Sequence, residues 1–364
     1  MTRHTLARYF GWKFFVAMVS VFLGVFALVA LVDYIDLMRR AGDVPNAPVL
    51  SLMQMSVYRV PQIMERLMPF SVLVGTMACF LGLSRRMELV VARGAGMSAW
   101  QIVAPAIVVA LIFGAFGTMI YNPVSASLRE ISKRIEAQIF NNQMQSMMET
   151  YVGSYWVRQR GNDGESILNA LQSREQGLKL SNITVFTFRS DGRFKERIEA
   201  QNAELEPGAW KLNQATVFAA NEPAKAFETY MLSTKLTREQ VAETFAAPDT
   251  VGFWHLPDYI RFAEDSGLAA AGYRLQYHLL LARPFLLAAM ILLGASVSLR
   301  AFRFGGVPQR ILIGVGAGFS LYVLSKVTED LAKAELLYPI VAAWLPITIG
   351  GLSGFMVLLY EEDG

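Results

Sequence analysis

The most informative residue spacing in this sequence occurs in the short segment Ser84–Gln101, where charged side chains are interspersed with Leu and Val. A helix over this segment would have one charged side and one apolar side. So short a helix buries little surface by itself, so it needs a surface to dock against. The chemistry that this pattern offers is recognition of another protein through ion pairs and apolar contacts. The charged side chains that would make those contacts are Arg85, Arg86, Glu88 and Arg93.

The ends of this segment carry capping signals. Ser84 is a candidate N-cap residue, and Gly94 and Gly96 are typical of a helix C-terminus. Ser98 with Gln101 three residues later predicts a capping box that begins the next helix. Two interpretations stay open: a turn between two membrane spans, or a coupling helix of about 84–97 that fits a groove in a cytoplasmic motor subunit.

A second set of basic residues follows apolar runs, where it would meet anionic lipid head groups. Arg129 and Lys133 stand at i,i+4 and share one helical face. Their charged groups can bind phosphate through charge-assisted hydrogen bonds, and Arg283 in the outer turns of the fourth apolar run belongs to the same set. The alternative is that these side chains are solvated or snorkel to lipid phosphates as anchors. The candidate head-group residues are Arg39, Arg40, Arg129, Lys133 and Arg134.

The sequence contains no pattern typical of catalysis or metal binding. His4, His255 and His278 are scattered, and the single cysteine, Cys79, lies in an apolar run and has no disulfide partner. No phosphate-binding G-x-x-x-x-G-K-[ST] loop occurs, and we expect no carboxylate inside the membrane that could relay protons. We therefore expect a non-catalytic subunit without a cofactor or metal, driven by ATP that a separate ATPase binds.

Composition and apolar runs predict a membrane protein. Of 364 residues, 54% are hydrophobic and only 17% are charged. Six apolar runs are long enough to cross a hydrocarbon core of about 30 Å. The first follows Lys13 and has no signal-peptide cleavage site after it, so we expect it to be retained. The predicted spans are Phe14–Val32, Leu67–Leu83, Ala99–Tyr121, Leu279–Leu299, Gln309–Ser325 and Leu337–Leu359.

The positions of the basic residues predict the orientation. Lys and Arg precede the first span and lie between spans two and three and between spans four and five, whereas the segment Asp33–Arg66 is charge-balanced. By the positive-inside rule both termini are expected in the cytoplasm. The net charge of +3 is small and gives no reason to expect nucleic acid as a partner.

The interval between spans three and four would then lie outside the cytoplasm. Pro123–Met148 has the pattern of a polar helix, and Leu256–Gly267 that of a helix leading to span four. Between them, turn clusters such as Glu206-Pro207-Gly208 separate short runs, which favours a jelly roll or sandwich. The predicted strand runs are 155–157, 166–171, 183–188, 198–205, 216–220 and 227–232.

The predicted fold class is a polytopic α-helical membrane protein with six transmembrane helices and an inserted periplasmic, all-β, jelly-roll-like domain. The predicted regions are 1–121 with three spans and the coupling helix, 122–278 with a β domain at about 150–235, and 279–364 with three further spans.

The run Leu83–Gln101 (LSRRMELVVARGAGMSAWQ) resembles the intracellular motif of the lipopolysaccharide export permease family, the paired LptF and LptG proteins. The resemblance extends over essentially the whole chain. Three further stretches resemble the LptG type: Leu31–Gly42 at the end of span one, Gly272–Leu275 before span four, and Gly316–Phe319 in span five.

This resemblance implies an inner-membrane complex of one LptF-like and one LptG-like permease with an LptB-like ATPase dimer. Such a complex draws lipopolysaccharide from the outer leaflet of the inner membrane and passes it to LptC-like and LptA-like periplasmic bridge proteins. On that pattern Glu88 would meet the ATPase groove, Arg39 and Arg40 would face the phosphates of the glycolipid, and Lys133 would lie near a basic cluster above span three. Some LptG-type members have lysine where this chain has Asp33.

Two other functions stay open from the sequence. One is a permease of a different ABC-linked lipid or lipoprotein release system, although those proteins usually place the large external domain after the first of four spans. The other is a lipid-binding membrane scaffold without a transport role.

Overall fold

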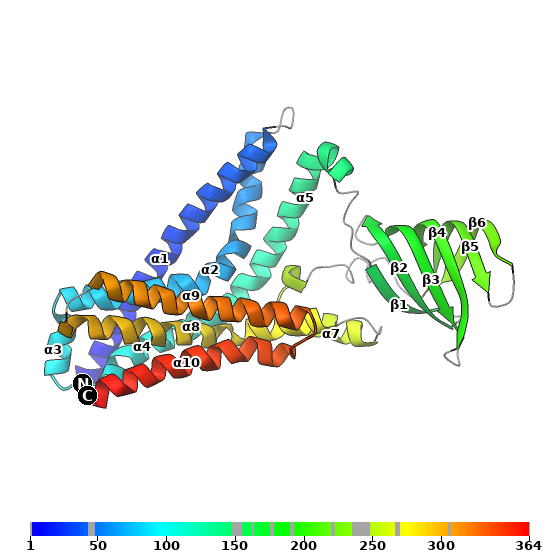
Figure 1. Ribbon diagram of the computed structural model, residues 1–364. Coiled ribbons are helices and arrows are strands. Elements are labelled where there is room, and N and C mark those ends of the chain that lie inside the picture. Colours follow the sequence, from blue (N-terminus) through cyan, green and yellow to red (C-terminus); the bar gives the residue numbers. More distant parts are fainter. Residues whose placement is uncertain are drawn as a thin grey trace. The chain divides into compact units, whose positions relative to one another are not determined.

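A computed structural model describes residues 2–42, 48–147, 155–161, 164–174, 178–189, 193–219, 223–234, 248–265, 270–304 and 307–363. The chain folds into two compact units. The first comprises Met1–Glu136, Gly252–Leu256 and Ala271–Gly364, and the second comprises Ala137–Val251 and Pro257–Ala270. The first unit is helical, and the second is built around a β-sheet (Figure 1).

Long apolar helices make up the first unit. Six of them have the length and composition needed to cross a membrane, which confirms the six predicted spans. Three precede the inserted β unit in the chain and three follow it. The helices are α1 (Thr2–Ala41), α2 (Val49–Arg85), α3 (Glu88–Gly94), α4 (Ala99–Phe116), the π-helix η1 (Gly117–Tyr121), α5 (Asn122–Met147), α8 (Ala271–Phe304), α9 (Val307–Lys333) and α10 (Pro339–Asp363).

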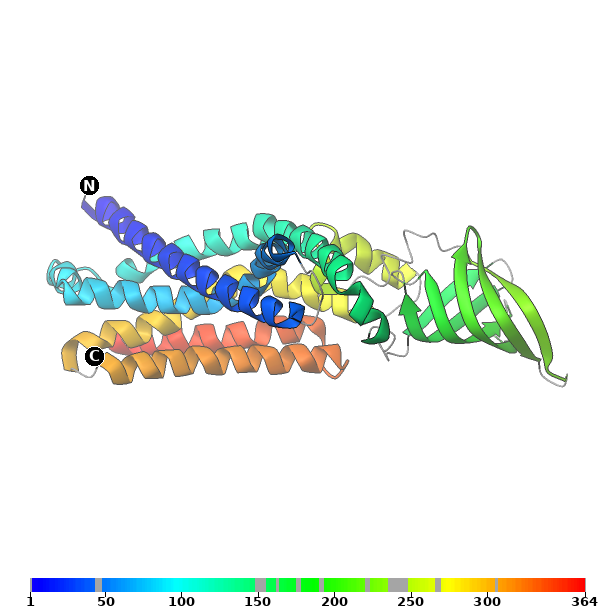
Figure 2. The ribbon, with the colours of Figure 1, turned by 90° about the horizontal axis from the view of Figure 1, so that it is seen from above.

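Helix α8 is central to the packing of this unit. It contacts α2, α4, α9 and α10, and Figures 1 and 2 both show α8, α9 and α10 side by side. Small residues permit these close contacts: a Cβ added to Gly114 on α4 would lie only 2.5 Å from the Cα of Pro284 on α8. The buried core includes Phe14, Leu73 and Met290. The outer surface keeps many large apolar side chains exposed, as expected where lipid is the solvent.

Three segments lie at one end of the helical unit. The beginning of α1, the short helix α3 and the end of α10 are found together at that end in both views (Figures 1 and 2). Consecutive spans therefore alternate in direction, and the connection between spans two and three lies at the same end as the two chain termini.

The third span and the polar helix after it form one continuous helical segment. α4 passes through η1 into α5 without a break, and the polar helix predicted over 123–148 is observed as α5. Within η1, Thr118 Oγ1 donates a hydrogen bond of 2.8 Å to the carbonyl oxygen of Leu280 on α8. A π-turn is a local irregularity of the kind often found at functional sites.

The second unit contains one antiparallel sheet. Its strands follow the chain order, so each hydrogen-bonds with its sequence neighbours, and each predicted strand run overlaps one of them. A jelly roll would have Greek-key crossovers between two sheets, whereas the described strands form an up-and-down meander. The strands are β1 (Tyr155–Gly161), β2 (Gly164–Arg174), β3 (Lys179–Phe188), β4 (Phe194–Glu206), β5 (Ala209–Ala219) and β6 (Lys225–Ser233).

One face of the sheet is apolar, as the loose alternation in the sequence predicts. Ile183 and Val185 on β3 are buried with Trp210 on β5. The β4–β5 hairpin turns at Pro207 and Gly208, where Gly208 has φ +83°, a left-handed conformation that suits glycine. The 3-10 turn η4 (Pro248–Thr250) and helix α7 (Leu256–Asp265) follow the sheet, and α7 confirms the helix predicted there.

Candidate functional site

The short helix α3 begins later than the sequence predicts. Ser84 is not its N-cap: the chain continues as α2 to Arg85, and Ser84 lies buried inside that helix. The backbone turns at Met87, which has φ +61° and occupies the N-cap position of α3. The apolar core holds the last turn of α2 in place and overrides the local preference of serine for an N-cap.

The C-terminus of α3 confirms the predicted stop signals. Gly96 adopts φ +84° and its N–H donates to the carbonyl of Arg93, while the N–H of Met97 donates to the carbonyl of Ala92. This pair of bonds is a Schellman motif. Ser98 and Gln101 then form the predicted capping box at the start of α4, with both reciprocal hydrogen bonds present. Both ends of α3 are thus fixed in orientation.

Helix α3 is anchored by one side and exposed on the other. Leu89 and Ala92 are buried in the core of the helical unit together with Phe10 of α1. Val90 and Val91 are 41% and 70% exposed. An exposed apolar strip of this kind, on a helix whose other side is firmly packed, is typical of a docking surface.

The charged residues predicted for partner contact surround this strip. Arg85, Arg86 and Arg93 are exposed, and Glu88 is half-buried. Glu88 has a specific partner that the sequence did not predict: Tyr9 on α1 donates its phenolic hydrogen bond to Oε2 of Glu88 at 3.0 Å. The hydrogen bond ties the first residue of α3 to the beginning of α1.

The predicted head-group residues lie on α1 and α5. Arg39 and Arg40 end α1, and Arg40 makes an exposed ion pair of 2.8 Å with Asp36. Arg129 and Lys133 lie one turn apart on α5, Arg129 half-buried and Lys133 exposed. The backbone of Arg134 belongs to α5, whereas its side chain lies outside the described residues.

Helix α2 makes a polar contact with each of the two helices that carry these basic residues, α1 and α5. Arg59 on α2 forms a 2.7 Å ion pair with Asp33 on α1, and both side chains are largely buried. Ser132 on α5 donates a hydrogen bond of 3.2 Å to the carbonyl of Met55 on α2. Asp33 is therefore neutralised inside the helix pair.

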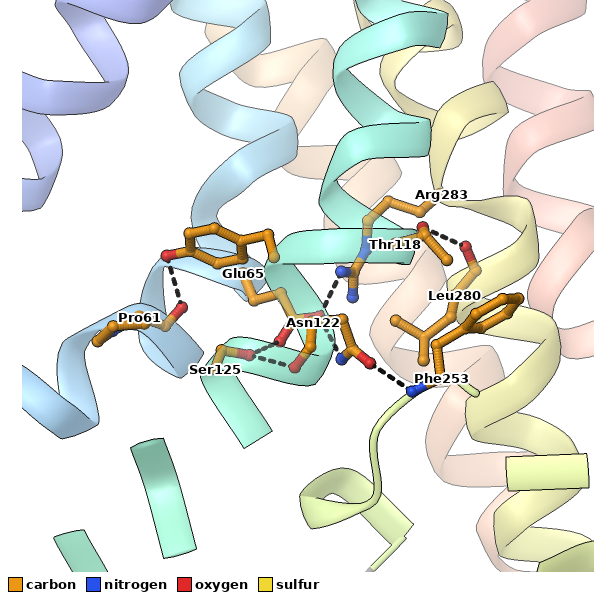
Figure 3. A network of polar contacts seen from close by, with 9 residues as sticks. Pro61, Glu65, Thr118, Asn122, Ser125, Phe253, Leu280 and Arg283 are labelled. Carbon is orange, nitrogen blue, oxygen red and sulfur yellow. Dashed lines mark hydrogen bonds and ion pairs between the residues drawn. The ribbon is translucent and has the colours of Figure 1, made fainter. Parts of the chain in front are cut away.

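A buried polar network lies where α2, η1–α5 and α8 meet (Figure 3). Glu65 Oε1 accepts hydrogen bonds from Arg283 and, at 2.7 Å, from Asn122, and its Oε2 accepts one of 2.9 Å from Ser125. The Glu65 and Arg283 side chains are only 7% and 14% exposed. Glu65 is therefore a buried carboxylate just before the predicted start of span two, and Arg283, grouped with the head-group charges, is instead engaged by it.

The same network reaches the segment that returns from the β unit in the chain. Asn122 Oδ1 accepts a hydrogen bond of 2.9 Å from the backbone N–H of Phe253 (Figure 3). The indole N–H of Trp254 donates to the carbonyl of Met119, also at 2.9 Å. The ring of Phe253 stacks on Tyr277 of α8 with an interplanar angle of 6°.

These residues could have been suspected from the sequence by one signal. An ionisable residue buried among helices is costly unless it is paired, so a buried Glu65 or Arg283 needs a partner. The sequence placed Glu65 just outside span two, in the charge-balanced segment Asp33–Arg66, and indicated no specific partner for it. No local pattern could indicate a partner 218 residues away.

The described part of the chain holds no cluster of His, Cys, Asp and Glu that could bind a metal ion. Cys79 is buried and unbridged, as predicted for the only cysteine. The arrangement offers a docking helix, basic residues on α1 and α5, and a buried ion pair; among the described residues we identify no catalytic constellation.

Comparison with known proteins gives one consistent result. The sequence profile of the family described as lipopolysaccharide export system permease LptF/LptG matches residues 8–360. The chain is 22% identical to lipopolysaccharide export system permease protein LptG of Escherichia coli K12 over 361 residues, which is 98% of this chain and 97% of that protein. It is also 22% identical to LptG of Haemophilus influenzae, over 93% of each chain. This chain therefore belongs to the LptF/LptG family of lipopolysaccharide export permeases.

Proposed function

We propose that this chain is a permease subunit of an ATP-driven exporter that extracts lipopolysaccharide from the outer leaflet of the bacterial inner membrane. The family match over residues 8–360 and the LptG names of its relatives support this proposal. The structural observation that carries it is α3, a short helix with one side buried and the other side exposed between spans two and three.

The proposed role of α3 is to transmit force from an ATPase subunit. Leu89 and Ala92 fix the helix to the core that it shares with α1, so a displacement of α3 would also displace α1. Val90 and Val91 would occupy an apolar groove of the ATPase. Arg85, Arg86, Glu88 and Arg93 would make the ion pairs around that groove.

In this proposal the end of the helical unit that carries α3 faces the cytoplasm. Exposed Arg85, Arg86 and Arg93 lie at this end, and excess positive charge favours the cytoplasmic side. Both chain termini would then be cytoplasmic, and the β unit would be periplasmic. Lipid would pass from the membrane to this unit and on to LptC-like and LptA-like bridge proteins.

The proposed contacts with the phosphates of the lipid come from the basic residues far from α3. Arg39 and Lys133 are the first candidates, because both are exposed. Arg40 would have to leave Asp36, which is inexpensive for an exposed pair. Arg129 and Arg134 complete the proposed set. Arg283 is excluded from it because it is held in a buried ion pair with Glu65.

The proposed partners are an LptF-like permease, an LptB-like ATPase dimer and the bridge proteins. A second permease would cover part of the exposed apolar surface of the helical unit. The chain itself would need no cofactor, since the ATP would be bound by the ATPase.

The experiment that tests this function is Glu88→Ala in the complex reconstituted with its ATPase. We expect weaker association with the ATPase and a loss of most lipid-stimulated ATP hydrolysis. Asp330→Ala is the matched control, because Asp330 is an exposed carboxylate on another helix and pairs only locally with Lys326. Normal assembly and normal stimulation in Glu88→Ala would contradict the coupling role.

The orientation has a separate test. Single cysteines at Gly94 and Phe194, introduced after replacement of Cys79, are labelled in intact cells with a membrane-impermeant thiol reagent. Phe194, in β4, is exposed, and we expect it to be labelled from the periplasm while Gly94 is protected. The reverse pattern would overturn the proposed topology.

A further inference from the structure

A groove of about 1070 Å³ lies between the first turns of α1 and the first turns of α4. α1 contributes Arg8, Trp12 and Phe15 to its lining, and α4 contributes Gln101 and Val108. All of these residues belong to the helical unit, and the groove lies at the end of that unit where α3 lies.

A close helix crossing forms the floor of the groove. A Cβ added to Gly11 on α1 would lie 3.5 Å from the Cβ of Pro105 on α4, so the two backbones approach at this point. The neighbouring residues Trp12 and Ala104 do not fill the space above the crossing: Ala104 is small and exposed, and the Trp12 side chain is 64% exposed. The groove is therefore open to the surroundings of the membrane-spanning helices.

The lining changes from polar to apolar along the groove. α1 and α4 both begin at the α3 end, so Arg8 and Gln101 lie near that end while Phe15 and Val108 lie further along. Phe15 stands seven positions after Arg8, which corresponds to about 10 Å of helix. One guanidinium at one end and an apolar channel at the other match the two parts of a phospholipid, an anionic head group and an acyl chain.

We propose that this groove binds an anionic phospholipid of the bilayer, with its phosphate on Arg8 and one acyl chain along Trp12, Phe15 and Val108. We choose an anionic lipid as the ligand because the positive charge of Arg8 complements the negative charge of a phosphate group. The described residues include no ion-pair partner for the Arg8 guanidinium. Trp12, an exposed indole at this level, is typical of the interface between membrane and water.

This site differs from the proposed head-group site for lipopolysaccharide. Arg8 and Arg39 stand 31 positions apart on α1, which is about 45 Å of continuous helix. The two sites thus lie at opposite ends of one span. The inference depends only on α1 and α4 crossing a membrane, so failure of the exporter proposal would leave it standing.

The test uses the full-length chain purified with its partner subunits and placed in nanodiscs that contain equal amounts of phosphatidylglycerol and phosphatidylcholine. Native mass spectrometry then measures the lipid that the protein retains. We expect phosphatidylglycerol to be retained about fivefold more than phosphatidylcholine, as for one cation at a membrane surface. Arg8→Gln should abolish this preference, and Arg8→Lys should keep most of it.

A second pair of variants tests the acyl-chain channel. Ala104→Phe fills the groove from its exposed wall without entering the core, and we expect it to remove the retained lipid. Ala27→Phe is its matched control, because Ala27 is also exposed on a spanning helix but does not line the groove. Equal retention of the two lipids, or full retention in Ala104→Phe, would overturn the proposal. So would a photo-crosslinker at Trp12 that captures a partner's transmembrane helix instead of lipid.

Discussion

Tyr9 and Glu88 are joined by a side-chain hydrogen bond of 3.0 Å across 79 residues of sequence. The bond connects the beginning of the first span to the first residue of the short helix α3. The ammonium group of Lys13 lies 5.4 Å from the centre of the Tyr9 ring, which further orders this corner. Among the described residues, Tyr9 contacts only Oε2 of Glu88, so Oε1 is available to a cation of a docking partner.

Tyr9→Phe removes this hydrogen bond and keeps the aromatic ring. The free Glu88 side chain would then lose conformational entropy on docking, and we expect the proposed ATPase partner to bind about fivefold more weakly, which corresponds to about 1 kcal/mol. The measurement is the dissociation constant of the ATPase from the permease complex. Tyr34→Phe, on the far part of α1, is the control. Equal affinities for the two variants would show that Tyr9 does not position Glu88.

The ion pair between Glu65 and Arg283 is expected to matter for stability far more than the exposed pair between Asp36 and Arg40. Glu65→Leu leaves a buried guanidinium without its partner, which costs about 3–5 kcal/mol. Asp36→Ala should cost less than about 1 kcal/mol, because exposed pairs are screened and flexible. Thermal unfolding in detergent can be followed by a thiol-reactive dye at Cys79, the only cysteine, which is buried.

A double variant separates the loss of the pair from the loss of packing. Glu65→Leu with Arg283→Leu removes both charges, and we expect it to recover most of the stability lost in the single variant. If Glu65→Leu were as stable as the unaltered protein, the ion pair would make no contribution to the free energy of unfolding. If the double variant recovered nothing, the hydrogen bonds of Asn122 and Ser125 to Glu65 would be the important contacts.

Asn122 connects the Glu65 network to the segment around Phe253, and Asn122→Leu should break that connection. Because the N–H of Phe253 loses its acceptor, we expect its amide to exchange with solvent at least about tenfold faster. Hydrogen exchange with mass spectrometry on a peptide spanning 252–256 measures this rate. Asn202→Ala, an exposed site in β4, should leave the exchange of that peptide unchanged.

Features with a local cause could be predicted from the sequence. Apolar length predicted the six spans, alternation and turn residues predicted the strands, and the pairing of Ser98 with Gln101 predicted a capping box. Ser84 shows the limit of this reasoning. Its side chain has the right chemistry for an N-cap, but the packing of the last turn of α2 decided where the helix ended.

The site could be predicted only in part, because its decisive contacts are tertiary. The sequence identified Glu88 by its position in an amphipathic segment, yet nothing near Tyr9 marks it as the partner. Arg283 looked like a head-group ligand until the structure placed Glu65 beside it. Pairing between distant helices is set by the fold, and a single sequence gives no measure of it.

Gly114 and Gly316 provide a matched test of helix packing. A Cβ at Gly114 would lie 2.5 Å from a backbone atom of Pro284, and neither helix can shift without disturbing the contact of Thr118 with α8. We expect Gly114→Ala to destabilise the protein by about 1–3 kcal/mol through overpacking. A Cβ at Gly316 meets nothing within 4 Å, so Gly316→Ala should cause no steric destabilisation. Because alanine has a higher helix propensity than glycine, we expect this substitution to add about 1 kcal/mol of stability. Thermal midpoints from dye labelling of Cys79 compare the two variants. Equal midpoints would mean that the α4–α8 crossing is loose enough to admit a methyl group, and the close approach at Gly114 would then not be a determinant of the fold.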